Sequence, residues 1–271
     1  PGVLLDAGLN HPQCIGILGL TSDDSANLAV AIAAKLMHPD VPVLCRALDR
    51  AVCSNMASFG TDHIINPFVT YGELLALAIE APGHYRLFNL MTAMPGRRTE
   101  RGTPPPRGRW IVCGYGRFGQ EVVSRFIEQR MDVTIIDPKP IDAAMERPQH
   151  AATAYVRGTG TEVGPLMQAG VTSCVGIVAG TDDDINNLSI AVTARELNPD
   201  LYVILRRNLQ ANRQLFEAYG AHHTLVPSEL IAHRSLAIMT TPLLSRFLKK
   251  MRERDDGDAA ALAQHIETLT F

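Results

Sequence analysis

The chain has 271 residues, which is enough for two domains of ordinary size. Apolar residues make up 46% and charged residues 20%, a composition typical of a globular protein with a hydrophobic core. The formal net charge of −3 gives no electrostatic case for nucleic acid as a partner. No apolar run approaches the roughly 20 residues that span a bilayer, so we expect no transmembrane segment in this chain. The five cysteines lack zinc-type spacing, which predicts no metal site and favours a reducing, cytoplasmic setting.

The first half of the chain contains a segment that recurs later. Placing Cys14–Pro67 over Cys174–Pro227, an offset of 160 residues, gives 18 identities in 54 positions without a gap. The period exceeds that of solenoid repeats, so we interpret it as two copies of one domain type. Residues 1–93 are predicted to form a partial first copy that lacks its glycine-loop half. Residues 94–108, rich in Pro, Gly and Arg, read as an exposed linker.

The second copy, residues 109–241, alternates short apolar runs with helical patterns. Strands are predicted at 109–113, 132–136, 154–156, 174–178, 202–205 and 222–225, and helices at 117–130, 182–196 and 208–218. This order predicts a Rossmann-like, doubly wound α/β fold with a parallel sheet. Thr181 is the expected N-cap of the helix that follows it.

The last segment, residues 242–271, is predicted to be a helical extension. Its acidic cluster, Asp255, Asp256 and Asp258, has two interpretations: a solvated turn, which is favoured, and a divalent cation site.

A glycine-rich loop stands between the first strand and helix of the second copy. Gly114-Tyr115-Gly116-Arg117-Phe118-Gly119 is a GxGxxG that follows an apolar strand and begins an amphipathic helix. Gly114 suits a tight turn, Gly116 lets the backbone approach a pyrophosphate, and Gly119 lets the helix pack closely on the sheet. The N-terminus of the helix then offers N–H groups to phosphates. The pattern predicts a nucleotide site.

The second strand of this copy ends at Asp137, 18 residues after Gly119. A carboxylate in this place accepts hydrogen bonds from the ribose of NAD or an adenine nucleotide and repels a 2′-phosphate. NAD/NADH or ADP/ATP are therefore the expected ligands, and NADP is disfavoured. The other interpretation of Asp137 is a turn residue before Pro138.

With the repeat and the loop in view, the sequence resembles the RCK family (regulator of potassium conductance, also called KTN or TrkA-N domains). The resemblance is carried by the loop with Arg117, by Leu166–Val171, by the segment Gly180-Thr181-Asp182-Asp183-Asp184-Ile185-Asn186-Asn187, by Asn198-Pro199-Asp200, and by Arg206, Gly220-Ala221 and Pro227-Ser228. It covers about 108–240 fully and 4–80 in part. One departure follows the third strand, where Gly158-Thr159-Gly160-Thr161 lacks the acid of the family's Gly-Asp-Ala-Thr-like segment.

The resemblance implies a ligand-sensing module that forms dimers and rings beneath a potassium pore in the same or a partner chain. It implies a cofactor site made by Gly114, Gly116, Arg117, Phe118, Gly119, Asp137, Thr181, Asp182 and Arg206. Two of these keep a second interpretation: Arg206 as a buried ion-pair partner, and Asp182 as part of a solvated helix start. Apolar residues at Leu74–Ile79 and Ile231–Met239 are candidates for dimer contacts or for ordinary core.

Together these features predict the cytoplasmic, nucleotide-sensing gating region of a potassium channel, without catalytic residues. A peripheral Trk/Ktr-type transporter subunit is the first alternative. An NAD-dependent oxidoreductase is the second, disfavoured because no histidine stands in a recognisable catalytic constellation.

Overall fold

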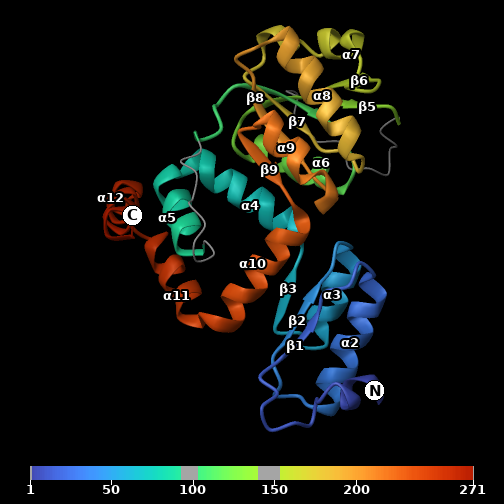
Figure 1. Cartoon of the computed structure of the whole chain (residues 1–271), viewed down its shortest axis with the longest axis vertical. Coiled ribbons are helices and arrows are strands. Elements are labelled where there is room, and N and C mark those ends of the chain that lie inside the picture. Colours follow the sequence, from blue (N-terminus) through green and yellow to red (C-terminus); the bar gives the residue numbers. More distant parts are fainter. Residues whose placement is uncertain (1, 93–102, 140–152, 271) are drawn as a thin grey trace.

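The computed structural model describes residues 2–92, 103–139 and 153–270, which contain two parallel β-sheets (Figure 1). The strand order is β1-β2-β3 in the smaller sheet and β6-β5-β4-β7-β8-β9 in the larger one. The strands are β1 (Ile17–Gly19), β2 (Val43–Arg46), β3 (His63–Ile65), β4 (Arg109–Cys113), β5 (Asp132–Asp137), β6 (Thr153–Arg157), β7 (Gly176–Ala179), β8 (Tyr202–Arg206) and β9 (His223–Leu225). The predicted α/β, Rossmann-like class is confirmed.

Helices lie between most of these strands and cover the sheets. They are α1 (Gly2–Asp6), α2 (Asp24–Met37), α3 (Arg50–Ser58), α4 (Pro67–Glu80), α5 (Pro82–Thr92), α6 (Arg117–Glu128), α7 (Val163–Gln168), α8 (Asp184–Leu197), α9 (Arg213–Tyr219), α10 (Pro227–Thr240), α11 (Pro242–Met251) and α12 (Asp256–Thr270), with short 3₁₀ turns at Val171–Ser173 and Gln210–Asn212. Among the described residues no helix is both long and apolar enough to cross a membrane.

The strand order of the larger, all-parallel sheet reverses at β4. The chain runs outward from β4 through β5 to β6, then returns to the other side of β4 and continues through β7, β8 and β9. Apolar residues fill both faces of the central strands, and Ile111, Ile177 and Val203 are fully buried. Ligands of such sheets bind at the carboxyl ends of the strands where the order reverses, here between β4 and β7.

The smaller sheet repeats one half of the larger sheet. Strands β1, β2 and β3 correspond to β7, β8 and β9 at the same offset of 160 residues, whereas β4, β5 and β6 have no counterpart in the described part of the first copy. The consequence is visible at β1, the edge strand. Leu18 is 50% exposed, while its counterpart Val178, lying against β4, is fully buried.

The two copies exchange their long crossover helices within the chain (Figure 1). Helix α4 follows the first sheet but packs on α6 of the second copy, and Leu75 and Ile79 join the same core as Trp110 and Phe126. Conversely, α10 follows the second sheet, and its Ile231 packs with Leu44 and Ile65 of the first. The apolar residues expected to make dimer contacts therefore include several that join the two copies of one chain.

Part of the expected linker lies outside the described residues, which resume at Thr103. Residues 103–108 rest on the second copy: the Tyr202 hydroxyl donates to the Thr103 carbonyl (2.6 Å), and the indole N–H of Trp110 donates to the Pro106 carbonyl (3.0 Å). The last residues before β4 are thus tied to the sheet that they lead into.

The C-terminal helices fold back onto the first half of the chain, where α12 packs against α5 around Leu87, Ala259 and Ala263. The expectation that Asp256 lies in a solvated turn is wrong. Its carboxylate accepts hydrogen bonds from the backbone N–H groups of Gly83 (3.0 Å) and His84 (2.8 Å), and contacts the His84 imidazole (2.8 Å). Because these groups need an acceptor at the start of α5, Asp256 holds the two helices together.

Candidate functional site

The glycine loop connects β4 to α6 and depends on glycine for its shape. Gly114 has φ +92°, in the left-handed region that favours glycine. A side chain at Gly119 would overlap the carbonyl oxygen of Gly114, so this glycine permits the close approach of helix and loop. Gly116 precedes the first residue of α6 and receives no side-chain cap, and a Cβ there would meet open space. The N-terminus of α6 thus begins beside open space, and its cap residue supplies no side-chain hydrogen bond.

Asp137 ends β5 beside this loop. Its Oδ2 accepts a hydrogen bond from the Tyr115 N–H (2.6 Å), and its Oδ1 accepts one from the Lys139 N–H (2.8 Å). The carboxylate therefore joins the glycine loop to the turn after β5. A carboxylate has about four lone-pair sites, so these two bonds leave acceptor capacity for hydroxyl groups of a ligand.

The turn from β7 to α8 forms another side of the site, next to the glycine loop and the end of β5. A buried asparagine holds this turn in place. The Asn187 side chain accepts hydrogen bonds from the Thr181 N–H (2.9 Å) and hydroxyl (2.7 Å), and donates to the carbonyls of Thr181 (3.0 Å) and Arg206 (2.8 Å). The prediction that Thr181 caps α8 is wrong. The helix begins at Asp184, so Asp183 is the N-cap and accepts from the Asn186 N–H (2.8 Å), while the Thr181 hydroxyl is bonded to Asn187.

Arg206 ends β8 and closes the site on its far side. Its Nη1 lies 2.7 Å from Oδ1 of Asp182, whose side chain is 92% exposed, while the Arg206 side chain is only 12% exposed. Burial lowers the pKa of the guanidinium, and the neighbouring Asp182 offsets only part of this effect. The alternative interpretation of Arg206 as an ion-pair partner thus describes a real contact, but that contact lies at the rim of a cavity.

These walls enclose a cavity of about 350 Å³ at the carboxyl ends of the strands. Its lining includes Gly114, Gly116, Asp137, Thr181, Asp182 and Arg206 from the predicted set. The other lining residues are Cys113, Tyr115, Ile136, Pro138, Lys139, Gly158, Thr159, Gly160, Thr161, Gly180, Asn186 and Ile190. Most of these follow the ends of β4, β5, β6 and β7, so the rule that binding loops follow the carboxyl ends of parallel strands was the signal that could have found them.

Three predicted residues do not line the cavity. Arg117 is exposed at the start of α6. Phe118 is fully buried, and its ring lies 5.7 Å from the rings of both Phe68 and Tyr71 of α4. Gly119 is buried against the loop. Phe118 and Gly119 therefore pack beneath the loop, whereas the family resemblance implied contact with the ligand. For Gly119 this agrees with the packing role that its place in the glycine motif predicts.

The loop that departs from the family pattern still lines the cavity. Thr159 stands where the family usually has an acid, and its hydroxyl donates to Oε1 of Glu162 (3.3 Å). With that acid absent, Asp137 and Asp182 are the carboxylates of the lining, and Lys139 and Arg206 are its cations. Burial raises the pKa of the Cys113 thiol, which also lines the cavity and so stays protonated.

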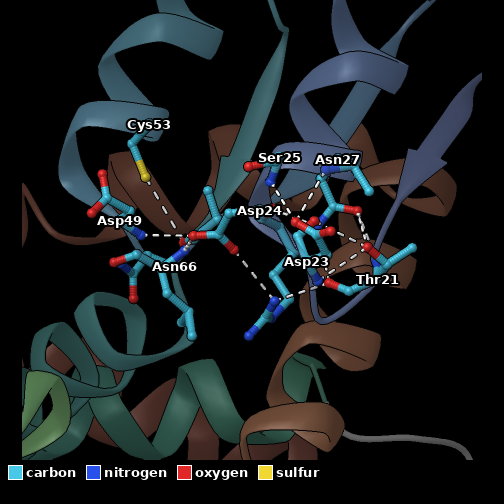
Figure 2. A network of polar contacts seen from close by, with 12 residues as sticks. Thr21, Asp23, Asp24, Ser25, Asn27, Asp49, Cys53 and Asn66 are labelled. Atoms are coloured by element: carbon cyan, nitrogen blue, oxygen red, sulfur yellow. Dashed lines mark hydrogen bonds and ion pairs between the residues drawn. The ribbon is translucent and has the colours of Figure 1, made fainter.

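The first copy keeps the same turn at the end of its first strand (Figure 2). Asn27 accepts from the Thr21 N–H (2.9 Å) and hydroxyl (2.8 Å), and donates to the Arg46 carbonyl (2.9 Å). Asp24 accepts from the N–H groups of Leu48 (2.7 Å) and Asp49 (2.8 Å). Within the described part of the first copy, the strand-end network thus forms with no glycine loop beside it.

Several known proteins that are similar to this chain carry names from potassium transport. The chain is 25% identical over 157 residues to "Probable potassium channel protein 2" of Methanocaldococcus jannaschii, covering 56% of this chain and 46% of that protein. It is 24% identical over 143 residues to the "Trk system potassium uptake protein TrkA homolog" of Pyrococcus horikoshii, covering 51% and 62%. The chain thus spans about half the length of these curated relatives.

Among solved structures, the GsuK channel has a similar fold. The chain superposes on GsuK bound to ADP with a TM-score of 0.61 at 18% identity, covering 87% of this chain and 54% of GsuK. A GsuK structure bound to NAD gives the same score at 15% identity, covering 83% and 51%. The family model of the TrkA-N domain matches residues 1–67 and 110–227. This family match falls on both copies and on strands that form the cavity, and the chain belongs to the TrkA-N domain family.

Proposed function

We propose that this chain is a nucleotide-sensing regulatory region of a potassium channel and that its ligand is an adenine nucleotide, NAD/NADH or ADP/ATP. The observation that carries the proposal is the cavity between the glycine loop, Asp137 and Arg206, at the switch point of the larger sheet. In this arrangement the N-terminus of α6 and Arg206 attract phosphates. Asp137 accepts hydrogen bonds from ribose hydroxyls and repels a 2′-phosphate, which disfavours NADP.

Regulation is favoured over catalysis by what surrounds the cavity. Among the described lining residues there is no histidine, and the thiol of Cys113 is held protonated by burial. The carboxylates of the lining are also engaged: Asp137 accepts hydrogen bonds from the N–H groups of Tyr115 and Lys139, and Asp182 is paired with Arg206. Groups held in this way favour sensing over turnover by an oxidoreductase. The similarity to potassium channel proteins and to GsuK bound to ADP and NAD supports both the ligand class and the regulatory role.

The proposed mechanism is linkage between ligand binding and the arrangement of the two copies in an oligomer at the inner face of the membrane. A nucleotide shifts the assembly only if it binds one arrangement more tightly than the other. A tenfold difference in affinity supplies about 1.4 kcal/mol per site, so several coupled sites are needed to move a pore decisively. A peripheral transporter subunit is the second candidate, favoured by the similarity to a TrkA homologue. Purification of the full-length protein distinguishes the two candidates. A pore in the same polypeptide indicates a channel, and co-purification of a separate membrane protein indicates a peripheral subunit.

Calorimetric titration with ADP, NAD⁺ and NADP tests the proposal. We expect saturable binding of ADP or NAD⁺ and weaker binding of NADP. Arg206→Gln should weaken ADP binding about tenfold or more, since a charge-assisted hydrogen bond to phosphate is lost. Its matched control is Arg46→Gln, the same position of the first copy, which should leave binding unchanged. If no adenine nucleotide binds the wild-type chain, the proposal is wrong.

A further inference from the structure

Arg206 touches more than the cavity. Its guanidinium carbon lies 4.9 Å from the ring centroid of Phe68 and 6.0 Å from that of Phe118, so the cation rests on two aromatic rings. Its Nε is buried, with no hydrogen-bond partner among the described residues. The side chain is thus held from below by rings and from the rim by Asp182, with one buried donor unused.

The ring nearest the cation comes from the other copy. Phe68 is the second residue of α4, the crossover helix that follows the first sheet, and it is 5% exposed. It contacts Phe118, which is the second residue of α6 and lies within the glycine motif. Arg206 therefore connects three parts: the cavity, the helix at the glycine loop, and the helix through which the first copy packs on the second.

The two partners of Arg206 differ in how easily each can be replaced. Asp182 is almost fully exposed, and such ion pairs contribute little because water solvates the freed carboxylate well. A phosphate group offers several anionic oxygens and accepts bidentate hydrogen bonds from a guanidinium. A phosphate entering the cavity thus displaces Asp182 readily. Phe68 is buried and fixed by α4, so it keeps its place beneath the cation.

The first copy shows that the fold does not require this arrangement. The counterpart Arg46 uses its Nη1 on the Thr21 carbonyl (2.9 Å) and on Asp24 (3.4 Å). Within the described ranges no aromatic ring lies under its guanidinium. An arginine on a ring is therefore particular to the copy that has the cavity.

We propose that Arg206 couples nucleotide binding to the docking of α4, with Phe68 as the positioning residue. This inference rests on the proposed function, that the cavity takes a nucleotide. When a phosphate takes the place of Asp182, the guanidinium stays on the Phe68 ring, and its position under the phosphate depends on α4 being docked. By reciprocity, a bound phosphate favours the docked position of α4. Adenosine lacks phosphate, so its binding affinity should not depend on Phe68.

The test compares ADP with adenosine by calorimetry. We expect Phe68→Leu to weaken ADP binding about threefold, the range of a partly exposed cation–π contact, and to leave adenosine binding unchanged. Tyr71→Leu is the matched control: it removes a ring of the same helix that contacts the same Phe118 but does not lie under Arg206. This control should not change the ratio of the two affinities. Asp182→Asn should strengthen ADP binding about threefold, because the phosphate no longer competes with a carboxylate.

Hydrogen exchange gives a second readout that needs no core substitution. ADP should slow exchange of the amides of α4 in the wild-type chain, and this protection should be absent in Arg206→Gln at ligand concentrations that saturate both proteins. If ADP binds the wild type but neither protects α4 nor distinguishes Phe68→Leu from Tyr71→Leu, the coupling is overturned while the proposed function stands. If neither ADP nor NAD⁺ binds the wild type, the proposed function fails, and the coupling fails with it.

Discussion

The two copies build the same turn and use it differently. After β1, the Thr21 N–H donates to Asn27 at 2.9 Å; after β7, the Thr181 N–H donates to Asn187 at 2.9 Å. In each copy the asparagine also reaches the carbonyl of the arginine at the end of the next strand, at 2.9 Å and 2.8 Å. Among the described residues, a glycine loop lies beside this turn in the second copy only. The threonine–asparagine network is therefore a device of the fold, and the ligand site is decided by the strands β4 and β5 next to it.

The largest expected effect tests whether that network is structural in both copies. Asn27→Ala and Asn187→Ala each remove a fully buried side chain and leave backbone groups without partners. We expect each to lower the free energy of unfolding by about 3 kcal/mol, measured by urea denaturation. Only Asn187→Ala should also weaken nucleotide binding. If Asn27→Ala were neutral, the equivalence of the two turns would be wrong.

Two glycine-to-alanine variants of the loop should have different effects, one on stability and the other on ligand binding. Gly119→Ala places a methyl group on the Gly114 carbonyl and should cost about 2 kcal/mol of stability. Gly116→Ala is the control within the same loop, since its methyl group would meet open space. This variant should unfold at the same urea concentration as the wild type, because its methyl group meets no protein atom. It should bind ADP more weakly in calorimetry, because Gly116 lines the cavity and the methyl group takes space from the ligand. Equal loss of stability in both variants would contradict the loop geometry.

The edge of the smaller sheet offers a matched pair at one repeat position. Val178→Thr puts a hydroxyl in a fully buried site beside β4 and should destabilise the chain by about 1.5 kcal/mol. Leu18→Thr changes the half-exposed counterpart and should cost less than about 0.5 kcal/mol. Thermal unfolding monitored by circular dichroism measures both. A large loss from Leu18→Thr would show that β1 is covered in the protein in solution.

The smallest expected effect concerns a histidine pair of the repeat. Burial, followed by the charge of His222, lowers the pKa of His223 to about 4, whereas its counterpart His63 is exposed. Between about pH 4 and pH 6.5, His223 is therefore protonated in the unfolded chain and neutral in the folded chain. This contribution to stability is fully present above about pH 6.5 and is lost as the pH falls toward 4.

Between pH 6.5 and 5 we expect His223 to account for about 1 kcal/mol of lost stability. His223→Gln should flatten the dependence of the unfolding free energy on pH in this window, and His63→Gln should not. Urea unfolding at a series of pH values measures the difference. Equal slopes in both variants would contradict the burial of His223.

For ligand binding, the comparison of the two copies rests on the two arginine variants already described. Arg206→Gln and Arg46→Gln occupy one repeat position, and only the former should change ADP binding. A loss of ADP binding in Arg206→Gln alone would show that the site depends on the second copy and not on the turn that both copies share.

Much of this protein follows from its sequence. The repeat, the alternation of apolar runs and helical patterns, and the glycine loop followed by Asp137 predict two Rossmann-like copies with one loop, since these features are local or depend on neighbouring segments. Gly114, Gly116 and Asp137 were placed at the cavity because the fingerprint fixes the geometry of a strand, a turn and a helix within a few residues. Family resemblance added Thr181, Asp182 and Arg206, which also line it.

Tertiary structure alone decided which copy each crossover helix stabilises. The apolar face of α4 has the same period whether it packs on its own sheet or on α6, so no pattern in the sequence reveals that Phe68 lies under Arg206. The same holds for Asp256, whose neighbours in sequence suggest a solvated turn but whose carboxylate meets the start of α5, more than 170 residues away. Local patterns fix the elements because backbone geometry is local; partners far apart in the chain are selected by packing, which a periodicity does not record.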